Sequence, residues 1–195
     1  MADFGDPEAY FANTIGVSVV LVSREKDGKK KVLFGERSEK QSFPKYNHNF
    51  AGFGDAFVYE TSKILENLKA VALTELTEEQ AELKREELEA FYFLGFSSGN
   101  RAGSKNPNYL NFDANFVVYS NLTAEELQKR GKLARDAADH RKVYALTLQE
   151  LEAMLSDSNA LFIPQGRAGL IQYLFLEDRA AGERVMQKYR EWQAN

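Results

Sequence analysis

One stretch of the sequence, Val71-Ala-Leu-Thr-Glu75-Leu-Thr-Glu78-Glu79-Gln-Ala81, combines apolar residues at helical spacing with three glutamates. The apolar residues over 64–76 recur at three- and four-residue steps, which predicts a helix. Glu75, Glu78 and Glu79 are separated by the same steps, so their carboxylates share one face of that helix. This face is the first candidate for chemistry in the chain.

Like charges at this spacing repel, and a cation among them would stabilise the helix. Mg²⁺ and Mn²⁺ prefer oxygen ligands, and Mg²⁺ typically takes one or two carboxylates together with phosphate oxygens. Such a metal site suits attack on a phosphoanhydride. Two plainer interpretations stay open: the glutamates form a solvated helix face, or Thr77-Glu-Glu-Gln80 is a capping box that starts a new helix.

The rest of the chain alternates between the patterns of strands and helices. Short β-branched or aromatic runs predict strands at 15–23, 32–37, 91–96, 112–119 and 142–147. Asp27-Gly28 predicts a hairpin turn between the first two strands, and Ser97 to Asn108 is expected to be a polar loop. Helices are expected after Thr123, at 148–155 and in the C-terminal tail. This order predicts a mixed sheet with helices on both faces.

Length favours one domain, because 195 residues suffice for a single core. We expect this domain to span 1–195, with an N-terminal lead over 1–14 and a helical C-terminal extension over 156–195. In that extension Val185, Tyr189 and Trp192 fall on one helical stripe. The stripe is typical of core packing or of a dimer interface, so a homodimer stays open.

Charge and composition exclude several classes of protein. The net charge of −4 comes from 25 basic and 29 acidic residues, and the segment 66–89 alone holds eight glutamates against three basic residues. A nucleic-acid partner would be indicated by an excess of basic residues, and the chain has no such excess. Zero cysteines exclude disulfides, thiolate metal sites and cysteine nucleophiles. Neither a membrane-spanning run nor a secretion signal is present, so a cytoplasmic location without a membrane partner is expected.

The residues before the helix make the interpretation of the glutamates more specific. Gly54-Asp-Ala-Phe-Val-Tyr-Glu60 places a glutamate after a glycine and five further residues. Together with 71–81 it resembles the signature of the Nudix hydrolases, G-x5-E-x7-R-E-U-x-E-E-x-G-U, in which U is a bulky aliphatic residue. Gly52-Phe-Gly54, after a strand and a proline-containing loop, looks like the family's approach to its box. The resemblance covers about 15–155 and implies an α/β fold, a Nudix-like α/β/α sandwich with a mixed β-sheet and a helical C-terminal tail.

The resemblance implies an activity: hydrolysis of a diphosphate linkage in a nucleoside diphosphate derivative, with Mg²⁺ or Mn²⁺ as cofactor. Glu75, Glu78 and Glu79 would hold the metal, and Glu78 and Glu79 would be catalytic, one of them as the base that activates water. Substrate contacts are expected at the following four residues: Arg37, Gly54, Glu60 and Arg101. The partner would be a small nucleotide derivative, and the enzyme a Nudix-type pyrophosphohydrolase.

Other residues are weaker candidates. An additional acid or base is often placed in a later loop of this family, where three residues qualify: Asp136, Asp139 and His140. Lys105 is a further cation for phosphate contact, and His48 is most simply structural. Three aromatic residues offer a stacking surface for a base or pack in the core: Phe43, Tyr46 and Phe50.

Four features depart from the Nudix signature. The gap between Glu60 and the expected arginine is six residues too long, and Thr74 stands in the arginine's place, where Lys69 is a weak substitute. Ala81 replaces the final glycine and Glu82 the aliphatic residue, so the helix is free to continue toward residue 88. These departures leave an alternative open, a catalytically weak or inactive Nudix-like module that binds a nucleotide or a partner. A plain α/β domain is the third interpretation.

Overall fold

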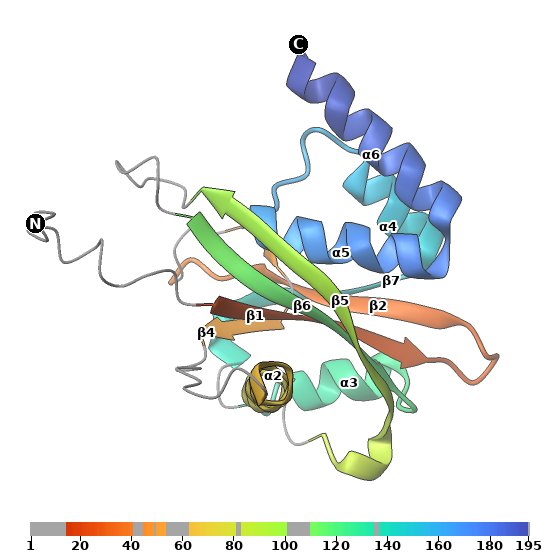
Figure 1. Ribbon diagram of the computed structural model, residues 1–195. Helices are drawn as coiled ribbons and strands as arrows, with labels where there is room; N and C mark the ends of the chain where they lie inside the picture. The colour runs from red at the N-terminus through yellow and green to blue at the C-terminus, as the bar shows by residue number, and fades with distance from the viewer. Residues whose placement is uncertain are drawn as a thin grey trace, which may run out of the picture.

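The computed structural model describes residues 15–40, 45–48, 50–53, 63–80, 83–100, 110–134 and 137–194. A mixed seven-stranded sheet forms the middle layer (Figure 1). Its strands are β1 Ile15–Arg24, β2 Lys30–Arg37, β3 Asn47–His48, β4 Phe50–Phe53, β5 Leu88–Asn100, β6 Leu110–Ser120 and β7 His140–Leu146.

The central strand of the sheet is β1. It runs parallel to β6 along one side, while its other side pairs antiparallel first with β4 and then with β2. Strand β5 pairs with β6, and β2 also pairs with β3 and β7. The hairpin turn expected at Asp27-Gly28 is confirmed: Gly28 has φ of +81°, a backbone conformation that glycine adopts without strain.

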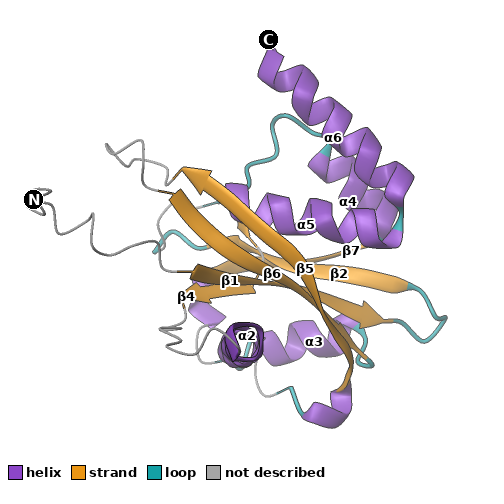
Figure 2. Ribbon diagram, in the orientation of Figure 1, coloured by secondary structure: helices purple, strands orange, loops and turns teal. Residues whose placement is uncertain are grey.

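Helices cover both faces of the sheet, which confirms the predicted α/β/α sandwich (Figure 2). On one face lie α2 Ile64–Gln80 and α3 Ala124–Gly131; on the other lie α4 Leu148–Leu155, α5 Pro164–Glu177 and α6 Arg179–Ala194. Two short 3₁₀ turns, η2 Arg85–Glu87 and η3 Ala137–Asp139, complete the described elements. None of the described helices is long and apolar enough to cross a membrane.

Two apolar clusters bind the layers together, because alternate residues of each strand face opposite sides. On the α2 side, Leu68, Ala72 and Leu76 of α2 pack against β1, β2 and β6. On the opposite side, α5 contributes Leu170 and Tyr173, both fully buried. Helices α5 and α6 therefore form an integral part of one helical layer.

The C-terminal stripe is buried at Val185 and half-buried at Tyr189 and Trp192. The rings of Tyr189 and Trp192 lie about the guanidinium of Arg167, with centroids 5.4 and 4.9 Å away. The same guanidinium donates to the carbonyl of Leu155 at 2.6 Å. This cation–π cluster joins α4, α5 and α6.

Three local expectations are wrong. Helix α2 does not continue to residue 88, because η2 and β5 begin at Arg85 and Leu88. No new helix starts at Thr77, whose hydroxyl donates to the carbonyl of Leu73 inside α2 at 2.8 Å. The polar residues 97–100 belong to β5, since their backbone pairs with 110–113 of β6. The sequence did not predict this part of the strand, because the four residues have weak intrinsic strand propensity. Pairing with the long strand β6 outweighs that propensity.

Candidate functional site

The glutamates lie in the second half of α2, on the face of the sheet that α2 and α3 cover. Glu75 and Glu78 are partly buried. The helix thus holds Glu75 and Glu78 at the boundary between its buried and its solvent-facing sides.

The end of α2 is an unfavourable place for negative charge. The last turn holds Glu78 and Glu79 and no basic residue. A helix C-terminus already carries roughly half a negative elementary charge from its backbone dipole. Helix α2 therefore has no basic side chain in its own last turn to offset this partial charge.

Two histidines meet on the same side of the sheet. His48 on β3 pairs in register with Gly35 on β2, and a Cβ atom on Gly35 would lie 2.0 Å from Nδ1 of His140. Because Leu33 faces α2, Gly35 two residues later faces the same way. The absence of a side chain at Gly35 makes room for His140. Since His48 is the cross-strand neighbour of Gly35 and His140 lies over it, both imidazoles are on the α2 side of the sheet.

His48 is neutral at physiological pH. Burial, helped by the positive charge of Arg37 and by His140, lowers its pKa to about 3. A neutral imidazole acts as a hydrogen-bonding or metal-ligating group and is no general acid near pH 7. The structural interpretation of His48 is consistent with this state.

The 3₁₀ turn η3 brings Asp139 to this side as well. The amide of Ser38 donates to the carbonyl of Asp139 at 2.8 Å, and Arg37 pairs in register with His140. The turn also contacts α2. The ends of β2 and β3, the start of β7 and η3 therefore converge next to the helix that carries the glutamates.

Neither Thr74 nor Lys69 takes the place of the Nudix arginine. Thr74 Oγ1 donates to the carbonyl of Ala70 at 3.1 Å, so its side chain is used within the helix. The Nζ atom of Lys69 lies 4.8 Å from the ring centroid of Phe91 on β5. Six residues along a helix turn Lys69 well away from the direction of Glu75. The suggestion that Lys69 substitutes for the arginine is therefore wrong.

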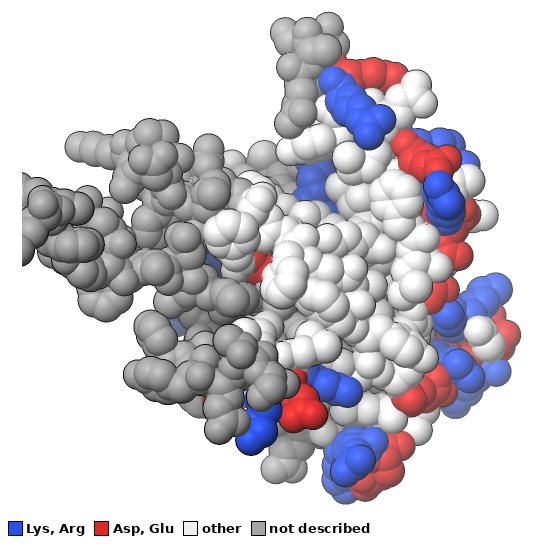
Figure 3. Space-filling model, viewed as in Figure 1, with Lys and Arg blue, Asp and Glu red and all other residues white. Residues whose placement is uncertain are grey.

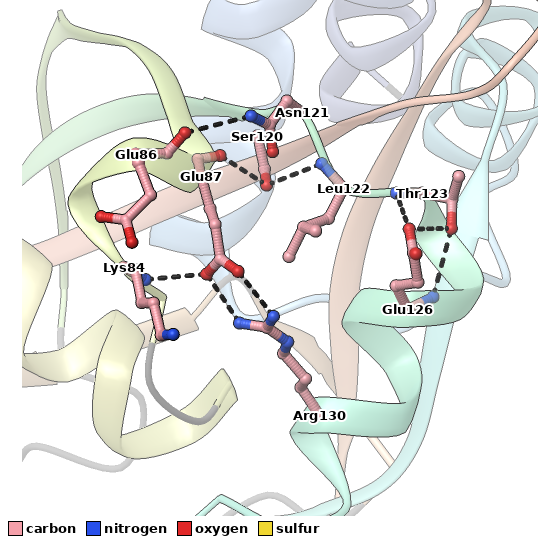
Figure 4. Close-up of polar contacts among 9 residues, drawn as sticks. All are labelled: Lys84, Glu86, Glu87, Ser120, Asn121, Leu122, Thr123, Glu126 and Arg130. Atoms are coloured by element: carbon pink, nitrogen blue, oxygen red, sulfur yellow. Dashed lines mark hydrogen bonds and ion pairs between the residues drawn. The ribbon is translucent and has the colours of Figure 1, made fainter.

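An ion pair fixes the connection between α2 and β5 (Figure 4). Arg130 of α3 binds Glu87 of η2 through two hydrogen bonds of 2.6 and 2.7 Å. The amide of Lys84 donates to the same carboxylate at 2.8 Å, and Ser120 Oγ and the Asn121 amide both donate to the carbonyl of Glu87 at 3.0 Å. This cluster, the Glu87 clamp, ties the exit of α2 to α3 and β6.

A buried polar patch on the opposite face of the sheet was not foreseen. Asp113, Asn115 and Ser18 are almost completely buried in β6 and β1. Asn115 Nδ2 donates to Ser97 Oγ at 3.0 Å, and its Oδ1 has no hydrogen-bond partner among the described residues. A Cβ on Gly16 would lie 2.1 Å from Asp113 Oδ1, so glycine makes room for this carboxylate. Polar residues at alternate positions of the apolar run 112–119 were the available signal.

Burial raises the pKa of Asp113 to about 6. A carboxyl group with such a pKa exchanges a proton near neutral pH, which is typical of functional sites although structural burial has the same effect. The patch faces α5, because Val117 and Val20 on the same strand faces pack against that helix. It is therefore separated from the glutamates by the sheet.

Several candidates lie outside the described residues: Phe43, Gly54, Glu60, Arg101, Lys105 and Asp136. The backbone of Glu79 and of Phe50 is described, but not their side chains. Among the side chains that are described, no group of three His, Asp or Glu residues could hold a metal ion. The roles predicted for the glutamates and for Arg37 remain predictions.

One cavity of about 430 Å³ is lined entirely by described residues. It lies away from α2, between the ends of β1, β6 and α5. Its polar walls are already paired: Arg24 with Glu89 at 2.8 Å, and Lys30 with Glu177 at 2.8 Å. Lys30 of the β1–β2 hairpin therefore reaches across to α5.

The sequence matches no family model and no curated protein. A NUDIX hydrolase from Alicyclobacillus acidocaldarius is similar in structure, with a TM-score of 0.56 at 12% identity over 81% of this chain and 89% of that chain. The NUDIX domain of Shewanella oneidensis NrtR, complexed with ADP ribose, gives 0.52 at 18% identity over 86% and 90%. The E. coli dihydroneopterin triphosphate pyrophosphohydrolase gives 0.52 at 14% identity over 84% and 97%.

The chain has the fold of the Nudix hydrolases. The resemblance deduced from the glutamates is thus confirmed at the level of the fold. Helix α2 carries the three glutamates of the proposed signature. The fold leaves both an enzyme and a nucleotide-binding module open.

Proposed function

We propose that this protein is a metal-dependent pyrophosphohydrolase that cleaves a diphosphate linkage in a nucleoside diphosphate derivative. One observation carries the proposal: three glutamates occupy the C-terminal half of α2, two of them, Glu75 and Glu78, are partly buried, and the helix dipole at this end favours a cation. The fold shared with two named hydrolases supports the same activity.

The residues of the site fit a hard cation. Glu75, Glu78 and Glu79 offer carboxylate oxygens, the ligand type that Mg²⁺ and Mn²⁺ prefer. When bound, the metal would supply neutralising charge for the diphosphate and orientation for water. The absence of cysteine is compatible with this choice, because no soft thiolate competes for the site.

The chain itself would move the proton. One of Glu78 and Glu79 accepts a proton from water as the water oxygen bonds to phosphorus, and the bridging P–O bond breaks so that each product carries a terminal phosphate. Arg37, at the end of β2 beside His140, is proposed to pair with a substrate phosphate. Gly54, Glu60 and Arg101 complete the proposed substrate contacts.

The proposal is tested by turnover in the presence of Mg²⁺ or Mn²⁺. ADP-ribose, a dinucleoside tetraphosphate and a nucleotide sugar serve as substrates, with a coupled phosphatase that releases phosphate from the monoester products. We expect Glu78→Gln and Glu79→Gln each to lower turnover by about 10²–10⁴-fold. Glu66→Gln is the matched control, because Glu66 is an exposed residue in the first turn of the same helix and the charge change is identical.

A nucleotide-binding module is the second candidate function. The lost arginine at Thr74 and the lost glycine at Ala81 favour it, and the NrtR NUDIX domain has been crystallised with ADP ribose. Metal-dependent binding of ADP-ribose without turnover, measured by calorimetry on the wild type, would select this module. Equal turnover in the wild type and both glutamine variants would reject the glutamate mechanism.

A further inference from the structure

Strand β5 presents an uncharged edge to solvent. Among the described strands it pairs with β6 alone, and residues 90–100 contain no charged side chain. Natural proteins usually protect a long edge strand with charges, proline or a covering segment. Two register shifts and the hydrogen bond from Gln172 to the carbonyl of Phe96 protect part of this edge.

Aromatic and aliphatic side chains flank this edge on both faces of the sheet. Tyr92, Phe96 and Leu176 are each more than half exposed, at 55%, 53% and 54%. Phe93 and Phe175 are exposed by 38% and 39%. We call these five residues the β5 edge face. Figure 3 shows an uncharged area over β5 and α5, with charged side chains at its margins.

The side chains of this face are held in place from within. Phe93 and Phe96 pack edge to face with ring centroids 5.0 Å apart, and Tyr92 packs in the same manner on Tyr119 at 6.1 Å. Phe175 rests on α6, where a Cβ on Gly182 would lie 2.8 Å from its ring. A face that is ordered before docking loses little side-chain entropy when a partner covers it.

We propose that the β5 edge face binds the same face of a second copy of this chain, to form a two-fold symmetric dimer. The exposed parts of the five side chains amount to about 400–500 Å² of mostly apolar area. A stable interface buries about 800 Å² on each partner, and its centre is the apolar part. The face therefore supplies the centre of such an interface.

A second copy fits better than an unrelated partner because the face is complementary to itself. It carries no net charge, so two copies meet without opposing like charges, and two-fold pairing of one apolar face closes the assembly at two subunits. The paired residues at the margin, Arg24 and Glu89 at 2.8 Å, remain solvated as a polar rim.

The test is the mass of the full chain in solution. Sedimentation velocity over a range of concentrations should show the wild type at twice 22.1 kDa. Tyr92→Lys and Leu176→Lys should each shift the chain to the monomer, because a buried lysine without a partner opposes association. Leu133→Lys is the control: Leu133 is 83% exposed but lies after α3, so this variant should stay dimeric.

Hydrogen exchange of the wild type gives a reading that does not depend on any variant. Amides of 90–97 should exchange more slowly at high than at low protein concentration, while those of α3 should not change. A wild type that is monomeric at every concentration would overturn the proposal. So would a dimer that both lysine variants retain, because the interface would then lie elsewhere.

Discussion

Asp113 illustrates at the scale of single residues how the sheet admits a carboxyl group into its interior. Gly16 lies directly opposite in register and leaves the space that the carboxylate occupies. Loss of solvent raises the pKa of Asp113 to about 6. The folded protein therefore prefers the neutral acid, and a single buried group couples stability to pH.

Asp113→Asn should stabilise the protein above pH 6 and leave it unchanged below pH 4. In the folded state Asp113 keeps its proton up to about pH 6, whereas in the unfolded chain it loses the proton near pH 4. The free energy of unfolding of the wild type therefore falls as pH rises through this window. Asparagine cannot ionise, so the variant avoids a cost of up to about 3 kcal/mol.

Urea unfolding at several pH values measures this difference directly. His48, whose low pKa makes stability fall as pH drops below about 6.5, contributes equally to both proteins. The difference between the two proteins therefore isolates Asp113. A difference that does not vary between pH 4 and pH 7 would show that the carboxyl group titrates normally.

At the scale of elements, α2 depends on the segment at its C-terminal end. Its last turn lacks a basic residue, and the chain leaves it toward η2, where the Glu87 clamp begins. Arg130 lowers the pKa of Glu87 through their paired hydrogen bonds, so the clamp is fully charged at neutral pH. The clamp holds η2 and the start of β5 against α3 and β6.

Arg130→Met should lower the free energy of unfolding by about 1.5–3 kcal/mol, because it removes two charge-assisted hydrogen bonds from a largely buried carboxylate. Arg130→Lys should recover part of the loss, since lysine keeps the charge but not the paired geometry. Thermal unfolding checks both. Lys129→Met, which removes the neighbouring and well-exposed pair with Glu125, is the control and should leave the melting temperature close to that of the wild type.

On the scale of the whole molecule, the sheet separates two polar regions. The glutamates, His48 and His140 belong to the side that α2 covers, while Asp113 and Asn115 face α5. Ligands that bind only the folded state stabilise both layers together, because the two apolar clusters share the same strands. Occupancy of the proposed metal site is therefore measurable as a change in the melting temperature.

Saturating Mg²⁺ or Mn²⁺ should raise the melting temperature of the wild type. At a hundredfold excess over the dissociation constant the gain is about 2.7 kcal/mol, or roughly 5–10 °C for a chain of this size. Glu78→Gln and Glu79→Gln should each lose most of this shift, because each removes a carboxylate proposed to hold the metal.

Differential scanning fluorimetry with and without metal gives this result, with Ca²⁺ as a second cation and Glu66→Gln as the charge-matched variant. An equal rise in the wild type and in both glutamine variants would mean that the metal binds elsewhere. The reading is independent of turnover, so it also applies if the protein is a binding module.

Much of the fold was predictable because its signals are local. Runs such as 15–23 can only be buried strands, and the Asp27-Gly28 turn joins two of them. The spacing of Glu75 and Glu78 on a helix with an apolar stripe predicted a candidate site on the side of the sheet that this helix covers. The full length of β5 was not predicted, because residues 97–100 have weak strand propensity and are extended only through their pairing with β6.

The sequence by itself determined the strand and helix pattern, the acidic helix and the resemblance to the Nudix signature, because each depends on periodicity over a few residues. Only the tertiary structure decided the rest. It placed His140 over Gly35, set Asp113 against Gly16 and left β5 at the edge of the sheet. These contacts join residues far apart in the chain, and strand register, which no local pattern encodes, brings them together.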